Sequence, residues 1–148
     1  MEKAPLTVRI RLLSASAKAP CKSHDGDAGW DLFASEEATI PPGGTMIIKT
    51  GIAMQIPHGW YGQIKSRSGL GAKGLIVTAG VVDSSYRGEI GVVAINGNSA
   101  PDGPAFAFRP GDKVAQMVFL PVPQVAIELA EDLSTSTRGE NGFGSTGR

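Results

Sequence analysis

Short runs of alternating apolar and polar residues dominate the chain. In the segment TVRIRLL, Val8, Ile10 and Leu12 fall on one face of an extended chain while Arg9 and Arg11 fall on the other, which is typical of an edge strand. Further runs rich in Val, Ile and aromatic residues are TMIIKTGIAMQI, WYGQIK, GLIVTAGVV, GEIGVVAIN, PAFAFR, DKVAQMVFLP and QVAIEL. Turn-forming sequences such as PPGG, PHG, SAPDGP and RPGD separate these runs. Many short strands with frequent turns predict an all-β sandwich or jelly roll.

Helical patterning is nearly absent. No window repeats apolar residues at helical spacing, although SGLGAK is compatible with a single helical turn. The regular patterning ends near Leu129. We therefore expect one β domain over residues 1–129 and a flexible C-terminal tail over residues 130–148, because a chain of 148 residues fits a single domain.

Composition and charge exclude several classes of function. Fourteen basic and fourteen acidic residues give no net charge, so no long-range field draws the protein to nucleic acid or an anionic membrane. Cys21 is the only cysteine, which excludes an internal disulfide and suits a reducing compartment. The sequence shows no signal peptide, and its apolar runs are far shorter than the roughly 18 to 20 residues that span a bilayer. We expect a cytoplasmic or other intracellular protein.

Several common catalytic motifs are missing, including the G-x-S-x-G elbow, the P-loop and paired cysteines for zinc. Polar groups beside glycines remain. In KSRSGL, Arg67 offers a planar fork for phosphate oxygens, Ser68 a hydroxyl, and Gly69 a close approach to the backbone. A strand end with a solvated arginine is the alternative interpretation. Gln116 lies on the polar side of an otherwise apolar strand.

The segment AGVVDSSYRGEI carries a second group of candidates. Asp83 follows an apolar run and opens a turn, where its carboxylate either takes a proton from water or bonds its own turn backbone. Tyr86 belongs to the same hairpin. Its ring either forms a flat wall of a site or packs in the core as an ordinary aromatic. Arg87 and Glu89 are spaced to form an ion pair across the hairpin. Surface charges of this kind usually serve solubility, which would explain both residues without a role in a site.

The C-terminal segment RGENGFGSTGR, residues 138–148, combines arginine, phenylalanine, hydroxyls and glycines. An aromatic ring stacks on a base for about 1 to 3 kcal/mol, and successive glycine amides wrap phosphates. The tail therefore has the chemistry of a lid over a phosphorylated, base-bearing ligand. A disordered end without function is the alternative.

Five segments, taken in order, resemble the five motifs of the trimeric deoxyuridine triphosphate nucleotidohydrolases. They are DAGWDLFA (27–34), KSRSGL (65–70), AGVVDSSYRGEI (79–90), GDKVAQMVF (111–119) and RGENGFGSTG (138–147). The resemblance implies a jelly-roll subunit, a homotrimer whose sites draw on all three chains, and hydrolysis of dUTP to dUMP and pyrophosphate with Mg²⁺. Such an activity limits uracil incorporation into DNA and supplies dUMP for dTTP synthesis.

The same resemblance implies roles for individual residues. By motif match, Asp83 would be the general base that orients the attacking water and would also contact the sugar 3′-hydroxyl. Tyr86 would pack under the deoxyribose and exclude a ribose 2′-hydroxyl, while Asp31 would lie near magnesium through water. The residues that would hold the phosphate chain are Arg67, Ser68, Gly69 and Gln116.

The tail motif would close the site. By the same match, Phe143 would cover uracil. Arg138, Ser145 and Thr146 would reach the terminal phosphate. Gly144 would also contact the substrate.

Two departures from the family pattern affect the base-binding region. Trp30 stands where tyrosine is usual in the first motif, and we expect its ring to pack while Asp31 does the polar work. The stretch from Gly71 to Val82 is short compared with some family members and is expected to bind uracil through backbone groups. Gly80 is the main candidate for that contact, with Val82 beside it.

Two other functions remain open from the sequence. Deoxycytidine triphosphate deaminase shares the fold but needs an additional carboxylate near the pyrimidine ring, and the strand GVVAIN, residues 91–96, contains none. A β-trimer that serves as a binding or regulatory module is the second alternative, because a fold does not fix a function.

Overall fold

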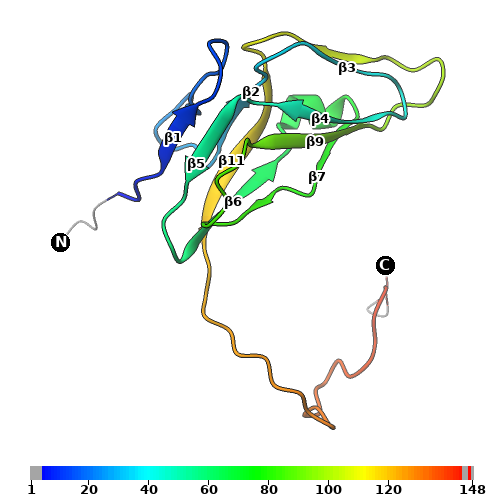
Figure 1. Ribbon diagram of the computed structural model, residues 1–148. Coiled ribbons are helices and arrows are strands. Elements are labelled where there is room, and N and C mark those ends of the chain that lie inside the picture. Colours follow the sequence, from blue (N-terminus) through cyan, green and yellow to red (C-terminus); the bar gives the residue numbers. More distant parts are fainter. Residues whose placement is uncertain (1–4, 145–146, 148) are drawn as a thin grey trace.

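The computed structural model describes residues 5–144 and residue 147, and within them the protein is almost entirely β (Figure 1). Eleven strands and one short helix follow in the order β1 (Arg9–Leu12), β2 (Trp30–Phe33), β3 (Ala38–Ile40), β4 (Thr45–Lys49), β5 (Ile52–Gln55), β6 (Trp60–Lys65), α1 (Ser68–Ala72), β7 (Leu75–Thr78), β8 (Val81–Val82), β9 (Gly91–Asn96), β10 (Phe106–Phe108) and β11 (Lys113–Pro121). The predicted all-β class is confirmed.

The strands form two larger antiparallel sheets and two strand pairs. The four-stranded sheet has the order β2-β11-β6-β8 and the three-stranded sheet the order β4-β9-β7, while β1 pairs with β5 and β10 with β3. One apolar cluster joins the two larger sheets: Leu32, Ile64 and Met117 come from the first, and Ile48 and Val92 from the second. The core therefore lies between the sheets, as a layered β architecture requires.

Alternation along the strands explains how the sheets bury this core. In β9 the residues Val92, Ala94 and Asn96 are buried, while the residues between them are half-buried. Asn96 is polar, yet its Nδ2 donates to the carbonyls of Ile40 and Pro104 at 3.0 and 2.8 Å. This buried amide costs little because it is fully paired, and it ties the end of β9 to the end of β3 and to the loop before β10.

The longest strand, β11, contains an irregularity that matters for the site. Against β2, Lys113 pairs with Phe33 and Ala115 with Leu32, so two steps along β11 match one step along β2. This is a β-bulge, which accommodates one additional residue and turns the side chains around it. Val114 and Ala115 are accordingly both buried, although a regular strand would bury only one of them.

Most of the predicted strands are present, and so is the single helical turn, which is α1. The edge character of β1 is confirmed, because β1 pairs only with β5. The sequence analysis did not identify β2 or β3 as strands, since each is too short for alternation to stand out. The strand expected at QVAIEL is wrong for the single chain, because the last strand ends at Pro121.

Residues 122–144 contain no helix or strand and lie on the surface. Figure 1 shows this segment leaving the body at the end of β11. Its apolar side chains are nearly bare, with exposed fractions of 91% for Ile127 and 98% for Leu129. The division between a domain at 1–129 and a tail at 130–148 stays a prediction. In the described part of the chain, no helix has the length and apolarity needed to cross a membrane.

Candidate active site

A first hollow lies where the loop before β2, the junction of β6 and α1, and β11 meet. We call it the arginine pocket; its volume is about 350 Å³ and its lining residues are Ser23, Asp27, Ala28, Gly29, Asp31, Arg67, Ser68, Gly69 and Gln116. The structure therefore brings together the predicted phosphate contacts and the predicted magnesium contact, although they come from three separate parts of the sequence.

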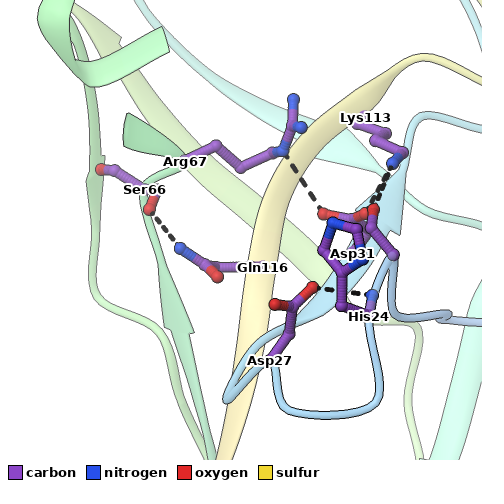
Figure 2. A network of polar contacts seen from close by, with 8 residues as sticks. His24, Asp27, Asp31, Ser66, Arg67, Lys113 and Gln116 are labelled. Atoms are coloured by element: carbon purple, nitrogen blue, oxygen red, sulfur yellow. Dashed lines mark hydrogen bonds and ion pairs between the residues drawn. The ribbon is translucent and has the colours of Figure 1, made fainter. Parts of the chain in front are cut away.

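Asp31 is the electrostatic centre of the arginine pocket (Figure 2). Its Oδ2 lies 2.7 Å from Nζ of Lys113, and its Oδ1 lies 3.4 Å from Nε of Arg67. The Asp31 side chain is only 14% exposed, so both ion pairs are less screened than pairs on the surface. Within residues 5–144, the terminal nitrogens of the Arg67 guanidinium make no hydrogen bond and stay available to an anion.

Gln116 is fixed on the other side of the pocket. Its Nε2 donates to the backbone carbonyl of Ser66 at 2.9 Å (Figure 2). Its Oε1 occupies the space beside Gly29, where a Cβ atom would lie within 2.0 Å of that oxygen. Gly29 is therefore required as a residue without a side chain. Ser66 in turn accepts a hydrogen bond from the amide of Val77 through its Oγ at 3.2 Å.

The helix α1 begins directly after Arg67, whose carbonyl accepts the amide of Gly71 at 2.8 Å. The first amides of a helix have no acceptor within it. Ser68 and Gly69 line the pocket at this point, and a Cβ atom at position 69 would meet nothing within 4 Å. An arginine fork, a hydroxyl and backbone amides beside open space suit a ligand with anionic oxygens.

A second hollow, which we call the aspartate pocket, lies between the hairpin at 79–90 and the neighbouring strands. Its volume is about 240 Å³ and its lining residues are Ile64, Ala79, Gly80, Val81, Val82, Asp83, Tyr86, Glu89, Ile90, Gly91 and Val93. Four of the predicted substrate and catalytic residues meet here: Gly80, Val82, Asp83 and Tyr86.

A tight turn forms one wall of the aspartate pocket. Ala79 and Gly80 both have positive φ angles, of 56° and 92°. The Gly80 carbonyl accepts the amide of Ile64 at 2.8 Å, and a Cβ atom on Gly80 would approach the Ile64 carbonyl to 2.8 Å. Glycine is needed here both for its backbone conformation and for the close approach to β6.

Asp83 has a free carboxylate. Within the described residues its side chain makes no hydrogen bond or ion pair, so the alternative in which it bonds its own turn is not observed. Its backbone carbonyl accepts the amide of Tyr86 at 3.1 Å, which closes the turn. The carboxylate therefore stays available for proton transfer on a backbone that is held in place.

Tyr86 and Arg87 brace the same hairpin. The Tyr86 hydroxyl donates to the Glu89 carbonyl at 2.9 Å, and a Cβ atom on Gly88 would lie within 2.5 Å of that hydroxyl. Tyr86 is 46% exposed in the single chain, so it is not a core aromatic. Pairing of Arg87 with Glu89 is wrong, because Nη1 of Arg87 donates instead to the carbonyls of Ser84 and Tyr86 at 2.7 and 3.0 Å.

Asp83 and Arg67 lie toward opposite ends of β6. The register of β8 pairs Val82 with Gly62, which places Asp83 beside Tyr61. Arg67 follows about six residues later, and at about 3.3 Å per residue this separates the two positions by roughly 20 Å. One copy of the chain therefore does not place Asp83 next to Arg67.

Of the predicted tail contacts that the structure describes, Arg138, Phe143 and Gly144 line neither pocket. Arg138 donates through Nε to the carbonyl of Asn141 at 2.9 Å, within its own turn. Phe143 and Gly144 are exposed, and Phe143 has a positive φ of 43°. Ser145 and Thr146, the other predicted tail contacts, lie outside the described residues.

The arginine pocket offers few carboxylates for a metal ion. No cluster of three or more His, Cys, Asp or Glu side chains occurs among residues 5–144 and 147. Asp27 and Asp31 both line the pocket, and Oδ2 of Asp27 already accepts the amide of His24 at 3.0 Å. Mg²⁺ keeps several waters and takes oxygens from a bound phosphate chain, so a single carboxylate that acts through water fits this donor set.

Sequence reasoning missed three residues that line or support the arginine pocket. Lys113, which pairs with Asp31, was quoted within a motif but received no role. Gly29 and Ser66 were quoted within motifs but received no role. A glycine directly before an aromatic residue is a common sequence feature. It does not indicate that the side chain of a glutamine on another strand fills the space beside Gly29.

Comparison with known proteins identifies the family. The sequence model of the dUTPase family matches residues 15–147, which include both pockets and the tail. The chain is 44% identical over 145 residues to the deoxyuridine 5′-triphosphate nucleotidohydrolase of Clostridium tetani, covering 96% of this chain and 97% of that protein. These findings define a nucleotide hydrolase of the all-β type. The chain belongs to the dUTPase family.

Solved structures agree with this assignment. The dUTPase of Staphylococcus bacteriophage 80alpha with dUpNHpp superposes with a TM-score of 0.88 at 30% identity, covering 96% of this chain and 99% of that one. A mutant dUTPase from phage phi11 of S. aureus, described with a structural Mg(II) ion, gives a TM-score of 0.79 at 30% identity, covering 85% and 97%. The predicted jelly-roll fold is confirmed by these likenesses.

Proposed function

We propose that the protein hydrolyses dUTP to dUMP and pyrophosphate. The observation that carries this proposal is the family match over residues 15–147, which spans both pockets and the tail. Two features of the chain support it. The aspartate pocket combines a free carboxylate, which can accept a proton, with a backbone wall, which can bind the nucleoside part of the substrate. The arginine pocket offers hydrogen-bond donors for the phosphate chain.

The chemistry is the displacement of pyrophosphate by water. The water oxygen bonds to the α-phosphorus, the bond from that phosphorus to the oxygen bridging the β-phosphate breaks, and pyrophosphate leaves with the electron pair. Asp83 accepts a proton from the attacking water and orients it. General base catalysis of this kind contributes about 10² to 10⁴ in rate, so Asp83 is proposed as the catalytic residue.

The arginine pocket binds and neutralises the phosphate chain. The terminal nitrogens of Arg67 and the hydroxyl of Ser68 donate to phosphate oxygens, and Gly69 leaves room for them. Gln116 is held by Ser66 and contributes its amide at the same position. Donors that are fixed before the substrate arrives need no reorganisation during the reaction.

Mg²⁺ is proposed as the cofactor, with Asp31 contacting it through water. Bound magnesium would neutralise charge on the phosphate oxygens and so assist departure of pyrophosphate. Asp31 suits this contact because its carboxylate accepts no backbone amide of the described residues, whereas Oδ2 of Asp27 already accepts the amide of His24.

The base and sugar are assigned to the aspartate pocket. Backbone groups near Gly80 and Val82 contact uracil, and the Tyr86 ring lies under the deoxyribose, where a ribose 2′-hydroxyl would clash. Support comes from the tight turn at Gly80 and from the bracing of the Tyr86 hydroxyl on Glu89. The tail closes over the ligand: Phe143 covers the base, and the phosphate contacts come from Arg138, Gly144, Ser145 and Thr146.

Each active site is proposed to use more than one copy of the chain, in a homotrimer. The separation of roughly 20 Å between the positions of Asp83 and Arg67 supports this, because one triphosphate must contact both. The bare apolar residues of the segment at 122–129 also support it, because such residues are normally covered in an assembly.

The test is pyrophosphate release by the purified protein with dUTP, dTTP, dCTP and UTP in parallel. We expect turnover of dUTP well above the other three. Ammonia release from dCTP would identify a deaminase instead, and absence of turnover with all four nucleotides would favour a binding or regulatory module.

A further inference from the structure

Lys113 lies beside the arginine pocket, where its ammonium group pairs with the pocket residue Asp31. We propose that it is a positioning residue: it shares the charge of Asp31 and thereby leaves the guanidinium of Arg67 free to bind phosphate. The inference rests on the proposed function in one respect, namely that the ligand of this pocket is a chain of phosphates.

The contacts place Lys113 behind Asp31. Its Nζ lies 2.7 Å from Oδ2 of Asp31 and 3.4 Å from Oγ of Ser23, so it joins β11 to β2 and to the loop before β2 (Figure 2). Arg67 approaches the other oxygen of the same carboxylate, through Nε at 3.4 Å. The shorter distance belongs to Lys113, so the lysine is the closer partner of the carboxylate.

The β-bulge creates this arrangement. Lys113 and Gln116 are three residues apart, and in a regular strand they would point to opposite faces of the sheet. The additional residue at Val114 reverses that relation, so that Gln116 lines the arginine pocket while Lys113 on the same face reaches Asp31. Bulges that redirect a side chain in this way are over-represented next to active sites.

A physical consequence follows for Arg67. When Lys113 loses its charge, Asp31 has only Arg67 as a cationic partner. The guanidinium is then drawn further onto the carboxylate, and the pocket also loses one positive charge. Both changes weaken the binding of phosphate oxygens, whereas the free carboxylate of Asp83 in the other pocket is untouched.

The experiment compares Lys113→Met, Lys113→Arg and Lys49→Met with the wild-type protein. Lys49 is the matched control, because it also pairs with a carboxylate, Glu36, at 3.6 Å, but that carboxylate lines neither pocket. Two quantities are measured at low and constant salt: the Kd of inorganic tripolyphosphate by calorimetry, and KM and kcat for dUTP. Melting temperatures verify that each variant is folded.

The expected result is a rise of about tenfold in both the Kd of tripolyphosphate and the KM for dUTP in Lys113→Met, which is about 1.4 kcal/mol, with a smaller change in kcat. Lys113→Arg should restore both values to within about threefold, because it keeps the charge. Lys49→Met should match the wild type.

Equal tripolyphosphate affinity and equal KM in folded Lys113→Met and wild-type protein would overturn the proposal. So would a loss in Lys113→Met that Lys113→Arg fails to rescue, since shape rather than charge would then matter. If the wild-type protein does not hydrolyse dUTP, the proposed function fails, and the tripolyphosphate measurements still decide the role of Lys113.

Discussion

The arginine pocket and the aspartate pocket are built in different ways. The arginine pocket is assembled from side chains on β2, at the junction of β6 and α1, and on β11, held by ion pairs to Asp31 and by the amide of Gln116. The aspartate pocket is almost local in sequence, and its shape comes from the backbone of residues 79–91 packed on Ile64.

The difference between the pockets matches the chemistry proposed for each. A phosphate chain carries several negative charges, which need donors and cations from several elements. A proton acceptor and a base-binding wall need few side chains, and an unpaired carboxylate on a rigid turn is sufficient. Substitutions in the aspartate pocket should therefore affect turnover and selectivity, while those in the arginine pocket should affect binding.

The largest effect is expected for Asp83→Asn. Removing the proton acceptor should lower kcat about a thousandfold while dUTP still binds, because the other contacts remain. Single-turnover kinetics and equilibrium binding of dUTP measure the two quantities separately. A kcat within about threefold of wild type would contradict the general-base role of Asp83.

Removal of the tail motif should have the next largest effect. A chain that ends at Thr137 loses the proposed lid, and its kcat/KM for dUTP should fall about a hundredfold because phosphate donors are lost and water enters the site. Its melting temperature should stay unchanged, since residues 138–144 are exposed. An unaltered kcat/KM would show that the tail does not close over the substrate.

Gly29→Ala tests the arginine pocket alone. The new methyl group would occupy the place of Oε1 of Gln116, so the bond from Gln116 to Ser66 should break. We expect KM for dUTP to rise about tenfold with a smaller effect on kcat. Gly26→Ala is the matched control in the same loop, because a Cβ atom there meets nothing within 4 Å. Equal KM values in the two variants would argue against a role for Gln116 in binding.

The smallest effect is expected for Gly88→Ala in the aspartate pocket. Its methyl group would displace the Tyr86 hydroxyl, and the ring would shift from its bond to Glu89. The preference for dUTP over UTP should fall several-fold, because a misplaced ring excludes a 2′-hydroxyl less well. Tyr86→Phe keeps the ring and should retain more of the preference. If Gly88→Ala leaves selectivity unchanged, Tyr86 does not exclude ribose.

The sequence predicted the aspartate pocket better than the arginine pocket. Asp83, Tyr86 and Gly80 lie within one turn-rich segment, so their proximity follows from local chain geometry. Lys113 and Gln116 share a face of β11 only because of a β-bulge at Val114, which no local pattern of residue types indicates.

The fold class was predictable because alternation and turn residues occur along most of the chain. The short strands β2 and β3 were missed, since three or four residues do not establish a period. The segment QVAIEL alternates like a strand but pairs with nothing in the single chain, because strand formation requires a neighbour as well as a pattern.

The central claim is that an active site joins the aspartate pocket of one copy to the arginine pocket of another. Mixing Asp83→Asn with Arg67→Ala tests this directly after they are unfolded and refolded together, at a low dUTP concentration where each variant alone should hydrolyse little dUTP. In mixed assemblies some sites receive Asp83 from one variant and Arg67 from the other, so about a quarter of wild-type dUTP hydrolysis should return. If the co-refolded mixture forms mixed assemblies yet remains as inactive as the separate variants, the claim is contradicted.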